Sequence, residues 1–164
     1  MIKNFITTLV FIIFFSTNSF SAGNDGGDSS SKVKSDYDKA VTYIKSAKKL
    51  EKKGKSEKAI KRYEKAQKLL IKSNKKKPNI ADTLNYLGFT TRKLGDYENG
   101  EKYYLQGLDL EPNHVGINEY LGELYVATNR MDLAKARLKV LESCNCKEYG
   151  ELEKVINGTK KSKY

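Results

Sequence analysis

Apolar side chains recur every three or four residues along most of the chain from about residue 36 onward, the spacing of helices that bury one face. The pattern divides into seven stretches, at about 36–53, 56–76, 80–94, 97–110, 114–128, 131–143 and 147–157. We therefore predict an all-α fold. The last stretch carries its apolar residues at helical spacing too, and it has the character of a helix that covers an exposed end.

Turn-forming residues lie between the first and second helix of each successive pair. Gly54 and Gly95 stand where a helix ends before a tight turn, because glycine accepts the left-handed backbone of a C-cap, and Asn129 is the next-best residue for that place. Ser56 and Asp96 follow at the positions where helix N-caps are expected. Short turns of this kind predict hairpins of adjacent helices.

The chain also repeats itself with a period of 34 residues. At this offset Leu87-Gly88 aligns with Leu121-Gly122, and the turn and small-residue positions follow in the same register. An earlier and weaker copy aligns Tyr63 with Tyr104, and its exit is seven residues longer, about two helical turns. The insertion therefore keeps the helical phase and predicts a longer second helix. Further aligned positions are Gly95 with Asn129, Gly100 with Ala134, Tyr104 with Leu138, and Ala59 and Ala66 with Gly100 and Gly107.

This order of Leu-Gly, small residue, aromatic residue, small residue and Pro112 resembles the tetratricopeptide repeat family. The resemblance implies a right-handed superhelical solenoid of three helical hairpins, at about 40–78, 81–114 and 115–146. Residues 36–143 would hold the repeats, and 144–157 a Cys-x-Cys turn and a C-terminal capping helix. Small residues such as Gly88 and Gly122 would let the two helices of a repeat approach closely.

The resemblance also implies a concave groove, lined by the first helix of each repeat, that binds a protein or peptide partner. In such a groove Asn85 would bond a peptide backbone and Arg92 would bind a carboxylate, while aromatic side chains give apolar anchorage. The alternative is that these aromatic side chains pack between repeats or under the capping helix. The candidate groove residues are Lys48, Lys52, Asn85, Tyr86, Phe89, Arg92, Tyr120 and Glu123.

The first 21 residues have the layout of a secretory signal peptide. Lys3 precedes an apolar run at 5–15, and the small residues Ser19 and Ser21 stand at the positions that a signal peptidase requires. We predict cleavage there and a periplasmic or secreted protein with no transmembrane segment after cleavage; the alternative is an uncleaved anchor. Residues 22–35 would form a flexible linker and 158–164 a disordered tail.

Charge is distributed unevenly. The formal net charge is +11, but residues 32–80 carry 18 Lys and Arg against 5 Asp and Glu, whereas 81–143 carry 7 against 10. The basic half suggests an anionic partner such as an envelope lipid or polymer, or simply a solvated face. Predicted export argues against nucleic acid.

Little in the sequence indicates catalysis or a cofactor. His114 is the single histidine and has no positioned nucleophile or carboxylate near it in the sequence, so we predict a protein that is not an enzyme and needs no cofactor. Cys144 and Cys146 are the two cysteines. They could form a bridge, remain inert thiols, or take part in redox or intermolecular pairing; as metal ligands they fall short of four. Residues 144–156 also resemble the end of small exported alphaproteobacterial repeat proteins.

Three functions follow. The first is an exported scaffold or adaptor that holds a protein or peptide in its groove. The second is a structural envelope protein that docks on an anionic surface through its Lys-rich first hairpin. The third is a thiol-redox protein that uses Cys144 and Cys146.

Overall fold

The computed structural model describes residues 34–161, so the predicted signal segment, most of the 22–35 linker and the end of the tail lie outside the described residues. Within that range there are seven α-helices and no strand. Each predicted helix is observed, with bounds that differ by no more than two residues, which confirms the all-α prediction. The helices are α1 (Asp36–Lys52), α2 (Ser56–Lys76), α3 (Ala81–Lys93), α4 (Tyr97–Leu110), α5 (Val115–Ala127), α6 (Met131–Leu141) and α7 (Lys147–Ile156).

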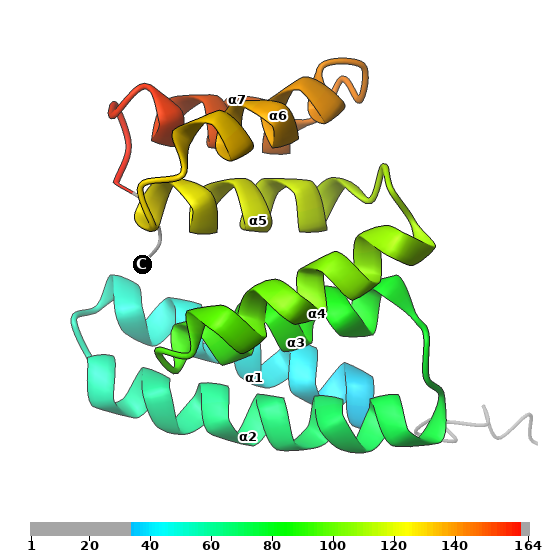
Figure 1. The fold of residues 1–164 in the computed structure, drawn as a ribbon. Coiled ribbons are helices and arrows are strands. Elements are labelled where there is room, and N and C mark those ends of the chain that lie inside the picture. Colours follow the sequence, from blue (N-terminus) through cyan, green and yellow to red (C-terminus); the bar gives the residue numbers. More distant parts are fainter. Residues whose placement is uncertain (1–33, 162–164) are drawn as a thin grey trace, which may run out of the picture. The chain divides into compact units, whose positions relative to one another are not determined.

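Consecutive helices pack as three hairpins, α1 with α2, α3 with α4 and α5 with α6 (Figure 1). The hairpins stack on one another because α2 packs on α3 and α4 packs on α5. α7 packs on both α5 and α6, so it covers the apolar face that the last hairpin would otherwise expose. The architecture is that of a helical repeat solenoid with a C-terminal cap.

Gly88 and Gly122 each allow a close contact between two helices. A Cβ at Gly88 would lie 2.5 Å from the ring of Tyr104, so this glycine joins α3 to α4 inside the second hairpin. A Cβ at Gly122 would lie 2.5 Å from Leu152, which belongs to α7. Gly122 therefore admits the capping helix rather than the partner helix of its own hairpin. Both of the large side chains are fully buried.

The turns follow the sequence predictions with one exception. Gly54, Gly95 and Asn129 have positive φ values of 67°, 93° and 58°. Asp96 caps α4, because its side chain accepts the backbone N–H of residue 99 at 3.1 Å. The prediction for Ser56 is wrong: α2 already begins at that residue, the preceding lysine holds the cap position, and no side-chain hydrogen bond forms there. The N-cap directly follows the turn glycine in both hairpins, so Lys55 is the counterpart of Asp96.

α2 has 21 residues and α4 has 14, so the first repeat has the longer second helix that its extended exit predicts. The extra seven residues make about two turns. Within residues 34–161, no helix combines the length and the apolar character needed to span a bilayer.

Candidate functional site

A hollow of about 420 Å³ lies along the first helices of the three hairpins. Its lining comes from α1, α3, α5 and the turn before α5, and the first two residues of α7 close one end. No residue of α2, α4 or α6 lines it. The lining residues are Val41, Ile44, Lys45, Lys48, Asp82, Asn85, Tyr86, His114, Val115, Gly116, Glu119, Tyr120, Lys147 and Glu148.

Asn85 is the polar group in this hollow with an unused acceptor. Its residue is 6% exposed, and its Oδ1 atom is buried with no hydrogen-bond partner among the described residues. Gly116 of α5 makes room for it, since a Cβ there would come within 2.8 Å of the Asn85 Nδ2 atom. A buried carbonyl oxygen without a donor costs free energy, and a ligand N–H would satisfy it.

Lys48 of α1 reaches across the hollow. Its Nζ atom donates to the Tyr120 hydroxyl at 3.0 Å and lies 4.4 Å from the centroid of the Phe89 ring. The Phe89 and Tyr120 rings are 5.0 Å apart. Burial raises the pKa of Tyr120, so the phenol stays neutral at physiological pH and accepts the lysine hydrogen bond. These contacts tie the first hairpin to the third across the second.

Arg92 and Glu123 form an ion pair behind the hollow. Arg92 Nη2 lies 3.2 Å from Glu123 Oε2, and neither side chain has any exposed surface. The guanidinium also lies 5.1 Å from the ring centroid of Phe89 and 5.2 Å from that of Tyr120. The carboxylate that we expected Arg92 to find on a ligand is therefore supplied by the chain itself, from the next hairpin.

The eight candidate groove residues thus fall into three groups. Four line the hollow, namely Lys48, Asn85, Tyr86 and Tyr120. Three others, Phe89, Arg92 and Glu123, are buried between helices. Lys52 is exposed near the end of α1 and lies outside the lining. The alternative of packing between repeats thus describes Phe89, whereas Tyr86 and Tyr120 are partly exposed in the hollow.

His114 has a structural role, as the sequence favours, but its specific role as a helix N-cap was not predicted. Its Nδ1 atom accepts the backbone N–H of Ile117 at 3.1 Å, which makes it the N-cap of α5. Its Nε2 atom lies 3.2 Å from Asp82 Oδ1 on α3. Because Nδ1 accepts, Nε2 carries the proton and donates to the carboxylate. The signal was the position of His114, directly before a helix and three residues ahead of the N–H that it caps.

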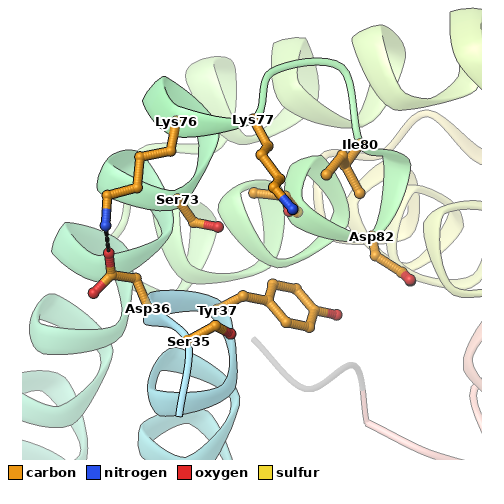
Figure 2. A pocket seen from close by; sticks show the side chains of 9 residues that line it. Ser35, Asp36, Tyr37, Ser73, Lys76, Lys77, Ile80 and Asp82 are labelled. Carbon is orange, nitrogen blue, oxygen red and sulfur yellow. Dashed lines mark hydrogen bonds and ion pairs between the residues drawn. The ribbon is translucent and has the colours of Figure 1, made fainter. Parts of the chain in front are cut away.

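A second hollow, of about 350 Å³, lies where the start of α1 meets the end of α2 and the start of α3 (Figure 2). On one side Asp36 pairs with Lys76 at 2.7 Å and with Lys72 at 3.5 Å. These lysines lower the pKa of Asp36, chiefly through the hydrogen bond from Lys76. Asp82 is part of the lining of both hollows.

Cys144 and Cys146 form a disulfide directly before α7. A bridge between these two cysteines is one of the alternatives that the sequence left open. Among the described residues, no group of three or more His, Cys, Asp and Glu side chains is placed to hold a metal ion. The bridge ends one residue before Lys147, which with Glu148 closes one end of the larger hollow.

Comparison with known proteins agrees with this geometry. Residues 81–114, which contain α3 and α4, match the tetratricopeptide repeat family, which the sequence pattern resembles. No curated protein sequence matches the chain. Among solved structures, the fold is similar to the first TPR of Spaghetti (RPAP3) bound to the HSP90 peptide SRMEEVD. That match has a TM-score of 0.52 and 20% identity, and it covers 77% of this chain and 98% of the other.

Proposed function

We propose that this protein is an exported scaffold that binds an extended peptide segment of a partner protein in the larger hollow. The observation that carries the proposal is Asn85, which lines a hollow built from three helical hairpins and whose Oδ1 atom has no hydrogen-bond donor among the described residues. A peptide backbone N–H is the donor that suits such an acceptor, because it is available at every position of an extended chain.

The rest of the lining favours recognition of backbone and apolar side chains over recognition of charge. Tyr86 and Tyr120, both partly exposed, line the same hollow as Asn85. The cations and the anions in the lining balance, with Lys45, Lys48 and Lys147 against Asp82, Glu119 and Glu148. Since Arg92 is already paired with Glu123, a terminal carboxylate has no dedicated partner in this groove.

The length of the track supports an extended ligand. The larger hollow has residues of α7, α5, α3 and α1 in its lining, and it shares Asp82 with the second hollow at the start of α1. A ligand that followed both would pass the partly exposed aromatic rings of Tyr37 and Tyr86, whose centroids are 5.9 Å apart. The solved structure with the similar fold holds a peptide, which agrees with this mode of binding.

The protein would act by positioning its partner, without a reaction of its own. From the N-terminal signal pattern we expect this activity in the periplasm or outside the cell, where the Cys144–Cys146 bridge would persist. The likeness of residues 144–156 to small exported alphaproteobacterial repeat proteins fits the same location.

Selection from a displayed library of random peptides tests the binding. The protein beginning at Ala22 is the bait, and enriched peptides are then titrated by fluorescence anisotropy. We expect Asn85→Ala to lower the affinity for an enriched peptide by up to about tenfold, which is the contribution of one hydrogen bond. Lys102→Ala on the exposed face of α4 is the control and should bind as the parent does. Failure to enrich any peptide, or equal affinity of the Asn85 variant, would contradict the proposal.

Export is tested separately. The full chain is expressed in a Gram-negative host, and the mass of the protein in the periplasmic fraction is measured. Cleavage after Ser21 predicts a product that begins at Ala22. An uncleaved product held in the membrane fraction would instead support the anchor.

A further inference from the structure

We propose that the outer face of α2 is a docking surface for an anionic phospholipid membrane. This inference is independent of the peptide groove, because no residue of α2 lines that hollow. α2 packs only on α1 and α3 within the described part of the chain, so its remaining face is turned to solvent (Figure 1).

The face is a continuous row of cations. α2 contains eight Lys and Arg residues against two Glu, and all eight are exposed. Six of the lysines follow each other at alternating steps of three and four residues, which puts them on one side of a helix over about 25 Å. We call these six residues the lysine row: Lys58, Lys61, Lys65, Lys68, Lys72 and Lys75.

The buried side of α2 explains this orientation. Ala59, Tyr63, Ala66 and Leu70 are at most 1% exposed, and they pack into the first core cluster. Residues at these positions occupy the opposite side of the helix from the lysine row. The helix is therefore held by its apolar face while the cations stay accessible.

Four of the six residues of the lysine row have no compensating contact among the described residues. Lys72 pairs with Asp36, and the ammonium of Lys65 lies 6.0 Å from the ring centroid of Tyr43. The other four have neither an ion pair nor a ring contact among the described residues; they are Lys58, Lys61, Lys68 and Lys75. Like charges one helical turn apart repel each other, so their concentration on one face disfavours the isolated helix and favours an anionic partner.

The chemistry of the row indicates a lipid surface. Lysine is a flexible point charge that suits many headgroups at once, whereas arginine is the residue for bidentate recognition, and α2 has a single arginine. A straight row about 25 Å long matches a flat sheet of headgroups. The predicted export would also bring the protein next to a membrane. The exposed Ile60 and Ile71 of α2 lie beside the row and not within it, so docking would be peripheral and mainly electrostatic.

Vesicle co-sedimentation tests the proposal. The chain is used from Ala22 onward, because the apolar run at 5–15 would itself enter a bilayer, and the described residues belong to the compact unit Val33–Tyr164. The probes are vesicles with phosphatidylglycerol and vesicles of phosphatidylcholine alone. We expect binding to the former only, and loss of binding at about 0.5 M salt, where the Debye length is about 4 Å.

The decisive variant is Lys58→Gln/Lys61→Gln/Lys68→Gln. Its partition coefficient onto the anionic vesicles should be at least about 100-fold lower, since each lysine at an anionic surface raises that coefficient about fivefold. The matched control is Lys135→Gln/Lys139→Gln/Lys154→Gln, which removes the same charge from exposed positions on α6 and α7. Glutamine has nearly the helix propensity of lysine, so both variants should fold, and circular dichroism checks this.

Each outcome of the vesicle experiment either supports or overturns the proposal. If the first variant loses binding to phosphatidylglycerol vesicles and the control variant retains it, the lysine row is the docking surface. Equal weakening of both would show that only net charge matters, and the proposal would be wrong. It would also be overturned by absence of binding to phosphatidylglycerol vesicles, including a case in which heparin or duplex DNA binds instead.

Discussion

At the scale of single residues, the arrangement around Arg92 shows how one buried contact decides what the groove can bind. The guanidinium and the Glu123 carboxylate come from the first helices of two neighbouring hairpins and lie 3.2 Å apart without solvent exposure. Two charges removed from water require each other, since the loss of one leaves the other uncompensated in a region of low polarity. The pair therefore fixes how α3 and α5 sit against each other, and it leaves Arg92 unavailable to a ligand.

We expect Glu123→Gln to lower the free energy of unfolding by about 3–5 kcal/mol, because the buried guanidinium keeps its charge beside a neutral amide. Urea unfolding followed by far-UV circular dichroism measures this. The control is Glu98→Gln, which removes the exposed pair of Glu98 with Lys102 and should cost less than about 1 kcal/mol. Similar small losses in both variants would show that the Arg92 pair is not needed for stability.

Gly88 gives a second prediction at this scale. A methyl group there would lie 2.5 Å from the Tyr104 ring, which is fully buried and cannot move aside freely. We expect Gly88→Ala to cost about 1–3 kcal/mol through overpacking. Gly150 of α7 is the matched control, since a Cβ there meets nothing within 4 Å, and Gly150→Ala should stabilise by about 1 kcal/mol through helix propensity. Thermal melts of both variants test this, and a stable Gly88→Ala would contradict the close packing.

At the scale of helices and turns, most of the fold was predictable because its signals are local. Periodic apolar residues, a left-handed Gly54 or Gly95 and the cap at Asp96 each act within one turn of the chain. The wrong prediction of Ser56 as an N-cap also reflects a local signal. If a helix begins one residue earlier than expected, the predicted cap residue becomes the first residue of the helix. Boundaries depend on such small shifts, whereas the existence of a helix depends on its whole apolar face.

The site was less predictable because it depends on contacts between distant residues. Phe89 and Arg92 occupy groove positions in the repeat pattern, yet here α1 and α5 bring Lys48 and Tyr120 across them. The repeat pattern does not show which distant side chains will contact each other. Glu123 pairs with Arg92 from 31 residues away, and Lys48 contacts Tyr120 from 72 residues away. The lysine row, by contrast, was visible in the charge count, since solvent-facing lysines need no tertiary partner to take their place.

The turn between α6 and α7 tests the thiol-redox alternative. A bridge between Cys144 and Cys146 closes a loop of three residues, so the chain-entropy relation gives a contribution of about 1–2 kcal/mol. We expect Cys144→Ser/Cys146→Ser to lose about that much in urea unfolding and to bind selected peptides unchanged. If the double variant or the reduced protein lost peptide binding, the bridge would have a functional role through the α7 residues that close the groove.

The junction of α1 with α2 predicts a dependence on pH. The lysines lower the pKa of Asp36 below its ordinary value of 3.8, so the folded state favours the ionised carboxylate. Its contribution to stability is therefore present above about pH 4 and is lost as the pH falls through the folded pKa. The melting temperature of the parent should exceed that of Asp36→Asn at neutral pH, and the gap should close in acid. A gap of constant size down to pH 2 would exclude this linkage.

At the scale of the whole molecule, a stack of three hairpins is near the minimum for a stable solenoid, so its end helix matters more than its length suggests. α7 places Leu152, which is fully buried, against Gly122, and it buries Val155 as well. Full burial of each such side chain contributes about 1.5–3 kcal/mol, against a typical domain stability of 5–15 kcal/mol. A chain that ends at Ser143 should therefore lose a large part of its stability.

We expect this truncated chain to melt at a much lower temperature and over a broader range, because the exposed face of α5 frays first and the one-dimensional stack then loses cooperativity. Leu152→Ala should show the same direction with a cost of about 2–5 kcal/mol, which separates the packing of one side chain from removal of the helix. The control ends at Asn157. It loses the partly exposed ion pair of Lys160 with Glu151 and the hydrogen bonds that residues 158–160 make to the end of α7, but no buried apolar side chain, so it should melt close to the parent. If the chain ending at Ser143 also melted like the parent, α7 would be an appendage, and the closed end of the groove would have to form without the support of the solenoid core.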